Sequence, residues 1–303
     1  CEAKTGRQLW RFRAAPIERR IPVYGQVLST WPAASGVLVQ DRVAYAAAGI
    51  VNYDGTHVYA LDAATGKIRR TYRLPNTREN DPRQWGYIAF KDNVLFGTAT
   101  DRKQITAEQQ RRGKISSGAT DTVFAHDTQS GTLLWAHQGK SISHVAMAVG
   151  DGKIFFVDSS LTPTQREEFL RQDKTALANL TGSSQKLAEE RIKKADLRMA
   201  TGLDARTGKV LWTKPVDVTD ASDIGEGGGS LTMIYHNNHL VLGGANANGH
   251  YWTQFLAGEF KRRRLVVLDS NSGEKMWAKD ANYRHRPIII DNEIIAEPWS
   301  YDL

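Results

Sequence analysis

Aromatic, basic and acidic side chains precede several short apolar runs of this chain, in a combination that suits ligand binding. They are Tyr24, Trp31, Trp85, His144, Glu226, Arg284, His285 and Arg286. A Trp ring offers a flat apolar face for stacking, and an Arg guanidinium can hold an anion through two hydrogen bonds. This mixture predicts a site for an anionic or sugar-like ligand. The alternative interpretation is structural, because Arg side chains paired with Glu226 or with an Asp would only satisfy buried polar groups.

A second candidate surface lies in residues 244–251, which contain Asn246, Asn248 and His250. Together with Glu226, the two Asn side chains supply the oxygen ligands that calcium prefers, but their spacing specifies no single metal site. The histidines of the chain do not share the spacing of zinc ligands. We therefore expect no metal site from the residues alone.

Other kinds of chemistry find little support in the sequence. The glycine-rich residues 225–229 lack the Lys-Ser/Thr ending of a phosphate loop and lead into a strand rather than a helix. The basic residues 261–264 have no interleaved aromatic side chains, so no nucleic-acid partner is expected. Neither a Gly-x-Ser-x-Gly turn nor a Ser-His-Asp constellation is evident, and no catalytic residue is assigned.

Composition is that of an ordinary globular chain, with 41% hydrophobic and 24% charged residues. The net charge of +7 is spread along the sequence, which indicates a solvated surface. Cys1 is the single cysteine, so no disulfide forms within the chain. No apolar run approaches the roughly 20 residues of a membrane-spanning helix, and we expect no transmembrane segment.

A short sequence motif occurs five times in the chain. It predicts the strands and turns that position these residues. It consists of an acidic residue, two variable residues, Thr or Ser, Gly, three further residues and a Trp. The copies are residues 2–10, 62–70, 127–135, 204–212 and 269–277. Their structural residues are Gly6, Gly66, Gly131, Gly208 and Gly273 with Trp10, Trp135, Trp212 and Trp277. The second copy ends in Arg70 instead of Trp.

Each copy predicts a tight hairpin, because Gly accepts the positive φ of such a turn and the acidic and hydroxyl side chains accept hydrogen bonds from turn amides. Upstream hairpins are predicted around residues 40–41, 91–93, 151–152, 236–238 and 291–292. The first four precede the second to fifth copies, and the last follows the fifth copy. Each repeat therefore supplies four strands. Residues 161–198 have helical spacing and few glycines, and we predict a helical insertion there, within the third repeat.

Four antiparallel strands per repeat predict an all-β fold, a β-propeller whose four-stranded blades surround a central channel. The first strand of each blade lines that channel, so the residues at the start of these strands are its candidate ligand-binding positions. About five blades are present in one domain, residues 1–303, which we expect to be cut at both ends.

The motif with its closing Trp resembles the repeat of quinoprotein dehydrogenases and of the related outer-membrane assembly propeller. The resemblance implies a ring of seven or eight blades, repeat Trp side chains that dock between blades, and an exported or periplasmic protein. It also implies pyrroloquinoline quinone (PQQ), held by a disulfide of neighbouring cysteines, a stacking Trp and calcium. Because the cysteine pair is absent here, we expect no cofactor, with PQQ and calcium as the alternative.

The functional hypothesis is a non-catalytic, quinoprotein-like propeller that acts as a scaffold for ligand or protein interactions. Its partner would be a protein or an anionic or carbohydrate ligand in the channel. Two alternatives stay open, a PQQ-dependent dehydrogenase and an accessory propeller of a larger enzyme that acts on an anionic or polymeric substrate.

Overall fold

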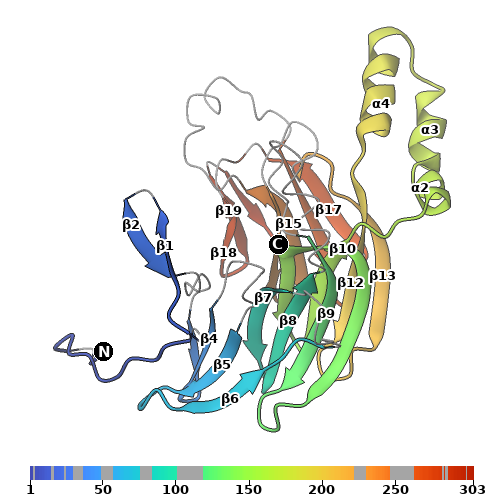
Figure 1. Ribbon diagram of the computed structural model, residues 1–303. Helices are drawn as coiled ribbons and strands as arrows, with labels where there is room; N and C mark the ends of the chain where they lie inside the picture. Colours follow the sequence, from blue (N-terminus) through green and yellow to red (C-terminus); the bar gives the residue numbers. More distant parts are fainter. Residues whose placement is uncertain are drawn as a thin grey trace. The chain divides into compact units, whose positions relative to one another are not determined.

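The computed structural model describes residues 1–2, 4–14, 17–23, 25–29, 37–48, 57–75, 84–100, 119–221, 230–245, 263–281, 283, 286–297 and 299–303. The chain divides into two compact units. The first unit comprises Cys1–Ser116 and Thr120–Gln138, and the second comprises Ser117–Ala119 and Gly139–Leu303. Strands dominate both units, as Figure 1 shows.

The first unit contains a small hairpin and two larger groups of strands. The hairpin is β1 (Arg20–Val23) with β2 (Gln26–Ser29). The first sheet is β3 (Leu38–Gln40), β4 (Val43–Ala48), β5 (His57–Asp62) and β6 (Ile68–Tyr72). The second is β7 (Gln84–Lys91), β8 (Val94–Thr100), β9 (Ala119–Asp127) and the first part of β10 (Leu133–Gly150).

The second unit continues from β10 through three further groups of strands. The third sheet is the rest of β10 with β11 (Lys153–Asp158), β12 (Leu197–Asp204) and β13 (Val210–Asp217). The fourth is β14 (Ser230–His236), β15 (His239–Ala245), β16 (Arg264–Asp269) and β17 (Lys275–Asp280). The fifth is β18 (Ile288–Ile290), β19 (Glu293–Ala296) and β20 (Trp299–Asp302).

Strand β10 differs from the prediction of separate sheets. It runs for 18 residues without interruption, so that β7 to β13 form one hydrogen-bonded series of seven strands. The boundary between the two units falls inside β10, after Gln138. Divided there, each half of the series has the four strands that one repeat predicts. The chain passes from the last strand of one repeat to the first strand of the next with no loop between them.

The predicted upstream hairpins are confirmed in all five repeats. Their turns place non-glycine residues at positive φ, as at Asp92 (51°) with Asn93 (61°) and at Asn237 (41°) with Asn238 (65°). Two successive residues with positive φ are typical of the type I′ turn, whose twist matches that of paired strands. In the first repeat the turn is shifted by one residue, because Gln40 pairs with Val43 and leaves Asp41 and Arg42 as the turn.

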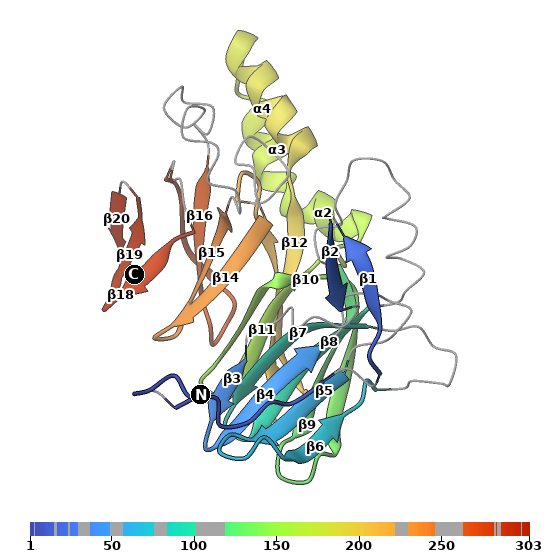
Figure 2. The same ribbon diagram turned by 60° about the vertical axis from the view of Figure 1, so that its left-hand side comes forward.

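The predicted helical insertion is present between β11 and β12. It consists of α2 (Pro163–Phe169), α3 (Arg171–Leu177) and α4 (Gly182–Lys194), one helix more than a simple hairpin. Thr162 begins α2 with a capping box, in which its hydroxyl accepts from the Gln165 amide and the Gln165 side chain accepts from the Thr162 amide. Helices α3 and α4 extend beyond the ends of β12 and β13 (Figures 1 and 2).

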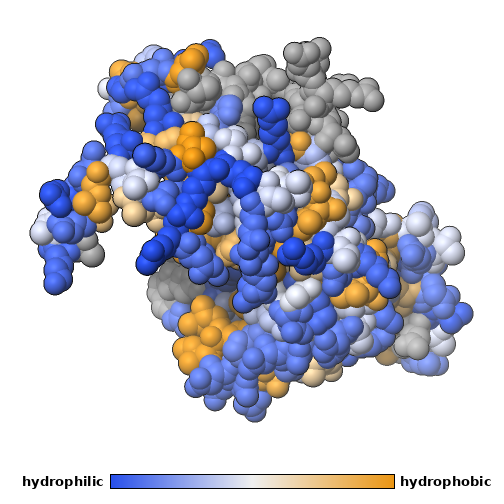
Figure 3. Space-filling model, turned by 90° about the horizontal axis from the view of Figure 1, so that it is seen from below, coloured by the Kyte–Doolittle hydropathy of each residue, from blue (hydrophilic) through white to orange (hydrophobic). Residues whose placement is uncertain are grey.

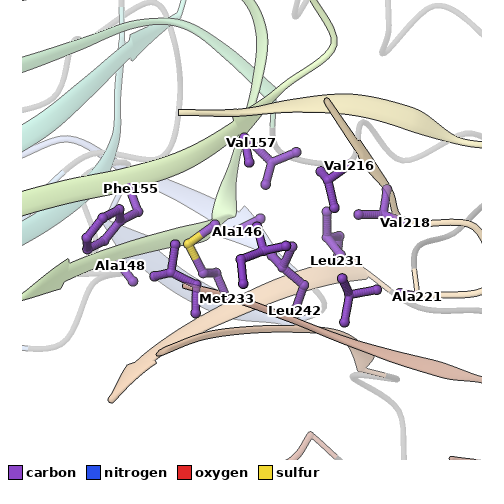
Figure 4. Packing of buried hydrophobic residues seen from close by; sticks show 14 of the residues in the cluster. Ala146, Ala148, Phe155, Val157, Val216, Val218, Ala221, Leu231, Met233 and Leu242 are labelled. Atoms are coloured by element: carbon purple, nitrogen blue, oxygen red, sulfur yellow. The ribbon is translucent and has the colours of Figure 1, made fainter. Parts of the chain in front are cut away.

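Neighbouring sheets of the second unit bury their facing side chains. Figure 4 shows Phe155 and Val157 of the third sheet near Leu231, Met233 and Leu242 of the fourth. The alternation of side chains along a strand directs the next residue to the opposite face. Val241 accordingly packs in a separate core with residues of the fourth and fifth sheets, whereas its neighbours Leu240 and Leu242 pack toward the third.

Strands that are buried on both faces explain why β15 and β16 are continuous apolar runs in the sequence. The first and second sheets pack in the same way within the first unit, through Tyr45, Val58 and Ala60 on one side and Leu95 and Phe124 on the other. This architecture confirms the β-propeller fold class, with four strands in each of the first four sheets, three described strands in the fifth, and a helical insertion in the third. The predicted total of seven or eight blades stays a prediction.

Candidate functional site

The acidic residue of each repeat organises the turn that follows it. Asp204 Oδ1 accepts from the Arg206 amide at 3.1 Å and from the amide and hydroxyl of Thr207, each at 2.7 Å. These bonds lower the pKa of Asp204. Gly208 follows with φ of 70°. The same acceptor pattern recurs at Asp62, Asp127 and Asp269.

The repeat Trp docks on the turn of the next repeat. Trp212 is buried, and its Nε1 donates to the Ser270 carbonyl at 2.9 Å. Its ring covers Gly273, where an added Cβ would lie 2.4 Å from ring atom Cε3. Trp10 covers Gly66 in the same way, at 2.5 Å. These glycines are therefore required twice, by positive φ and by the ring above them, and the Trp side chains serve packing.

The two other repeat Trp side chains also lie in aromatic surroundings. Trp135 is buried, with its ring centroid 6.3 Å from that of Phe96. Trp277 is half-buried, and its ring centroid lies 6.4 Å from that of Tyr301. Trp135 therefore packs within the second sheet, and Trp277 packs between the fourth and fifth sheets.

Trp85 is the one predicted channel residue whose side chain has a described packing environment. It is buried in the core of the first unit, where its ring meets Phe124 edge to face with centroids 4.8 Å apart. It also fills the space above Gly97, where an added Cβ would lie 2.4 Å from the ring. Through these contacts the Trp85 ring packs in the core of the first unit.

The other predicted ligand residues are only partly described. His144 lies in β10, where the structure describes its backbone alone, and Arg286 is exposed before β18. Tyr24, Trp31, Glu226, Asn246, Asn248, His250, Arg284 and His285 lie outside the described residues. Their convergence on one channel opening stays a prediction.

A large groove lies among the described residues of the second unit, and we name it the helix groove. It has a volume of about 790 Å³ and lies between α2, α3 and α4 on one side and β13 with the β16–β17 turn on the other. Its apolar lining comes from Phe169, Leu170, Leu177, Leu180, Ala188, Ile192, Ala195, Pro215 and Val216. The sequence predicts these helices, but not that they face β13.

Charged side chains also line the helix groove, and we call this set of residues its rim. Five cations and three anions line it, namely Arg171, Arg191, Lys214, Arg264 and Lys275 with Glu168, Asp217 and Glu274. Each anion has a cationic partner, because Arg171 pairs with Glu168 at 2.7 Å, Arg264 with Asp217 at 3.2 Å and Lys214 with Glu274 at 2.5 Å. Within the described part of the chain, Arg191 and Lys275 have no ion pair.

The described residues include no group of three His, Cys, Asp or Glu side chains that could hold a metal ion. Cys1 is exposed and free, and as the single cysteine it cannot supply the disulfide implied for quinone binding. No described helix has the length and apolar character needed to cross a bilayer.

Comparison with solved structures found several distant similarities. A quinohemoprotein alcohol dehydrogenase from Comamonas testosteroni has 16% identity and a TM-score of 0.44, with 90% of this chain and 42% of that chain covered. One from Pseudomonas putida HK5 has 14% identity and a TM-score of 0.42, with 88% and 41% covered. The chain thus spans about two fifths of the length of these two enzymes. The computationally designed Ika4 protein has 15% identity and a TM-score of 0.36, with 70% and 86% covered.

Comparison at the level of sequence is more specific. No curated protein matched the chain. The sequence model of one protein family, described as outer membrane protein assembly factor BamB, matches residues 1–299. Since this match includes nearly the whole of the 303 residues, the chain belongs to the BamB family of PQQ-type β-propellers.

Proposed function

We propose that this chain is a non-catalytic β-propeller that acts as a protein-interaction scaffold in the assembly of outer membrane proteins. The observation that carries the proposal is the family match over residues 1–299, whose description is an outer membrane assembly factor. On the same description we propose that the protein is exported to the periplasm. The scaffold role agrees with a rigid repeat fold, in which loops and insertions on stable sheets provide the binding surfaces.

The use of the repeat residues supports a role without catalysis. Asp204, Thr207 and Gly208 are engaged in a turn, and Trp212 is engaged in the joint to the next repeat. These residues form the most regular pattern in the sequence, and packing accounts for it. For the channel we propose a protein segment or an anionic or carbohydrate ligand, held by Trp31, Glu226 and His285.

The test of the proposed function is removal of the gene from the organism that encodes the chain. We expect smaller amounts of folded β-barrel proteins in the outer membrane fraction, restored by the wild-type gene. The chain should be recovered in the periplasmic fraction and should bind purified components of the outer membrane assembly machinery. Unchanged outer membrane proteins together with no binding to these components would refute the assembly role.

A separate measurement tests the absence of catalysis. The purified chain is mixed with PQQ and calcium, and the quinone absorbance and the oxidation of alcohols with an artificial acceptor are followed. We expect neither a retained quinone spectrum nor alcohol oxidation. Turnover in this assay would favour the dehydrogenase alternative and would contradict the non-catalytic part of the proposal.

A further inference from the structure

The helix groove combines an apolar floor with an excess of positive charge on its rim. The floor includes Phe169, Leu177 and Ile192 from the helices and Val216 from β13. Arg191 and Lys275 lie on the rim without an ion pair among the described residues. An apolar floor holds an apolar face through burial, and unpaired cations at the rim favour acidic groups.

The helices that form one wall of the groove have little support of their own. None of the described residues of α2 or α4 is buried, although α4 has 13 residues. Helices of this length are marginal in water without packing partners. Leu180, which lines the groove just before α4, is 38% exposed. Contact with a partner would remove this apolar surface from water.

The wall of the groove formed by β13 favours a bound helix over a bound strand. Strand β13 lies at the end of its series of strands, where a peptide strand could be added. Pro215 has no amide hydrogen, and proline is one of the means by which proteins blunt an edge strand. The ion pair between Lys214 and Glu274 lies beside the same edge. An added strand is therefore disfavoured relative to a helix that lies in the groove.

We infer that the helix groove binds an acidic, amphipathic α-helix of a partner protein. The apolar face of that helix contacts Phe169, Leu177 and Ile192, and its flanking Asp or Glu residues lie near Arg191 and Lys275. This inference goes beyond the proposed function, because it names a surface and the class of segment that it binds, and it does not depend on outer membrane assembly.

The test uses two designed peptides and the full chain. Each labelled peptide has about 14 residues, or about 21 Å of helix, with Leu on one face. Glu flanks this face in the first peptide, and Lys replaces Glu in the second. In fluorescence anisotropy titrations we expect saturable binding of the Glu peptide, at least about tenfold tighter than of the Lys peptide. Hydrogen exchange should show new protection in residues 169–192.

Charge-reversal variants locate the site without changes to its apolar floor. The double variant Arg191→Glu with Lys275→Glu should lose the preference for the Glu peptide. The matched control is Lys186→Glu with Lys209→Glu, which changes exposed Lys residues of α4 and of the β12–β13 turn outside the groove, and it should bind as the wild type does. Circular dichroism verifies that all variants are folded.

Three outcomes would overturn the inference. One is no saturable binding of the Glu peptide up to about 1 mM, the limit of weak association. Another is equal loss of affinity in the groove variant and in the control variant. The third is binding of phosphatidylglycerol vesicles that the groove variant abolishes, with no peptide binding, which would assign the surface to lipid. Each result is separate from the gene-removal experiment, so either idea can fail alone.

Discussion

The Arg70 guanidinium lies against Gly131, in the place that an indole ring takes above the turn glycine at Gly66 and Gly273. An added Cβ on Gly131 would lie 2.5 Å from Arg70 Cδ. Arg70 also donates to the backbone carbonyls of Gln129 and Ser130 in the same turn. The Arg side chain is long enough to reach this turn and supplies two N–H donors. The contact between the two turns therefore forms although Arg70 stands where the other copies have Trp.

Replacement of Arg70 with Ala should destabilise this joint. The variant loses two charge-assisted hydrogen bonds and the side-chain cover of Gly131, and we expect a loss of about 1–3 kcal/mol in the free energy of unfolding. Lys67→Ala, at an exposed position of the preceding turn, is the control and should change stability little. Chemical denaturation measures both. Equal midpoints for the two variants would contradict the bridging role of Arg70.

Trp212→Ala tests the packing role of the repeat Trp. The ring is 8% exposed and donates to the Ser270 carbonyl, so its removal leaves a cavity and an unpaired acceptor. We expect a loss of about 3–5 kcal/mol. Leu211→Ala, at an adjacent position that is 45% exposed, should cost far less. A midpoint of unfolding unchanged from that of the wild type in Trp212→Ala would refute the assignment of this Trp to packing.

Gly273→Ala and Gly152→Ala separate two reasons for glycine at a turn. Both positions have positive φ, 73° and 66°. An added Cβ on Gly152 meets nothing within 4 Å, whereas on Gly273 it would lie 2.4 Å from the Trp212 ring. Gly152→Ala should therefore cost about 1 kcal/mol from backbone strain, and Gly273→Ala clearly more. Equal losses in thermal or chemical denaturation would show that the ring contact contributes nothing.

His126 should make the stability of the first unit depend on pH. Its side chain is buried, with Nε2 3.0 Å from the Arg73 carbonyl, and burial lowers its pKa below the ordinary value of 6.5. The unfolded chain then binds a proton before the folded chain does. Stability is complete above pH 6.5 and falls as the pH decreases toward the lower folded-state pKa.

The measurement is the free energy of unfolding between pH 7 and pH 5, in the wild type and in His126→Gln. We expect a smaller decrease in the variant, because Gln does not titrate. Asp62 does not contribute to the change in stability between pH 7 and pH 5. Hydrogen bonds from Arg69 and Thr65 lower the pKa of its carboxyl to about 2, so its contribution to stability is lost only below about pH 4. Parallel pH curves for the two proteins would exclude His126 as the cause.

Local patterns in the sequence determined the repeat and its turns. The hydrogen bonds of Asp204 reach only Arg206 and Thr207, and the positive φ of Gly208 belongs to the same few residues. Such interactions depend on neighbours in the chain, so composition and spacing predict them. The helical spacing of residues 161–198 is local for the same reason, and the structure confirms helices there.

The exposed surface follows the composition of the sequence as well. Figure 3 shows one face of the molecule, where hydrophilic residues predominate and hydrophobic residues form separate patches. A net charge of +7 with scattered Lys and Arg predicts a surface of this kind. Composition alone does not say which apolar side chains remain in a groove.

Tertiary structure decided the features that join distant residues. Trp85 lies near the start of β7, and its ring is enclosed in a core by Phe124 and Gly97, which are distant in the sequence. Arg70 acts as a joint residue only because the turn at Gly131 is brought to it. The helix groove forms from residues near 170–192, 214–217 and 264–275. No local pattern encodes these contacts, because each depends on which faces of the sheets and helices are packed together.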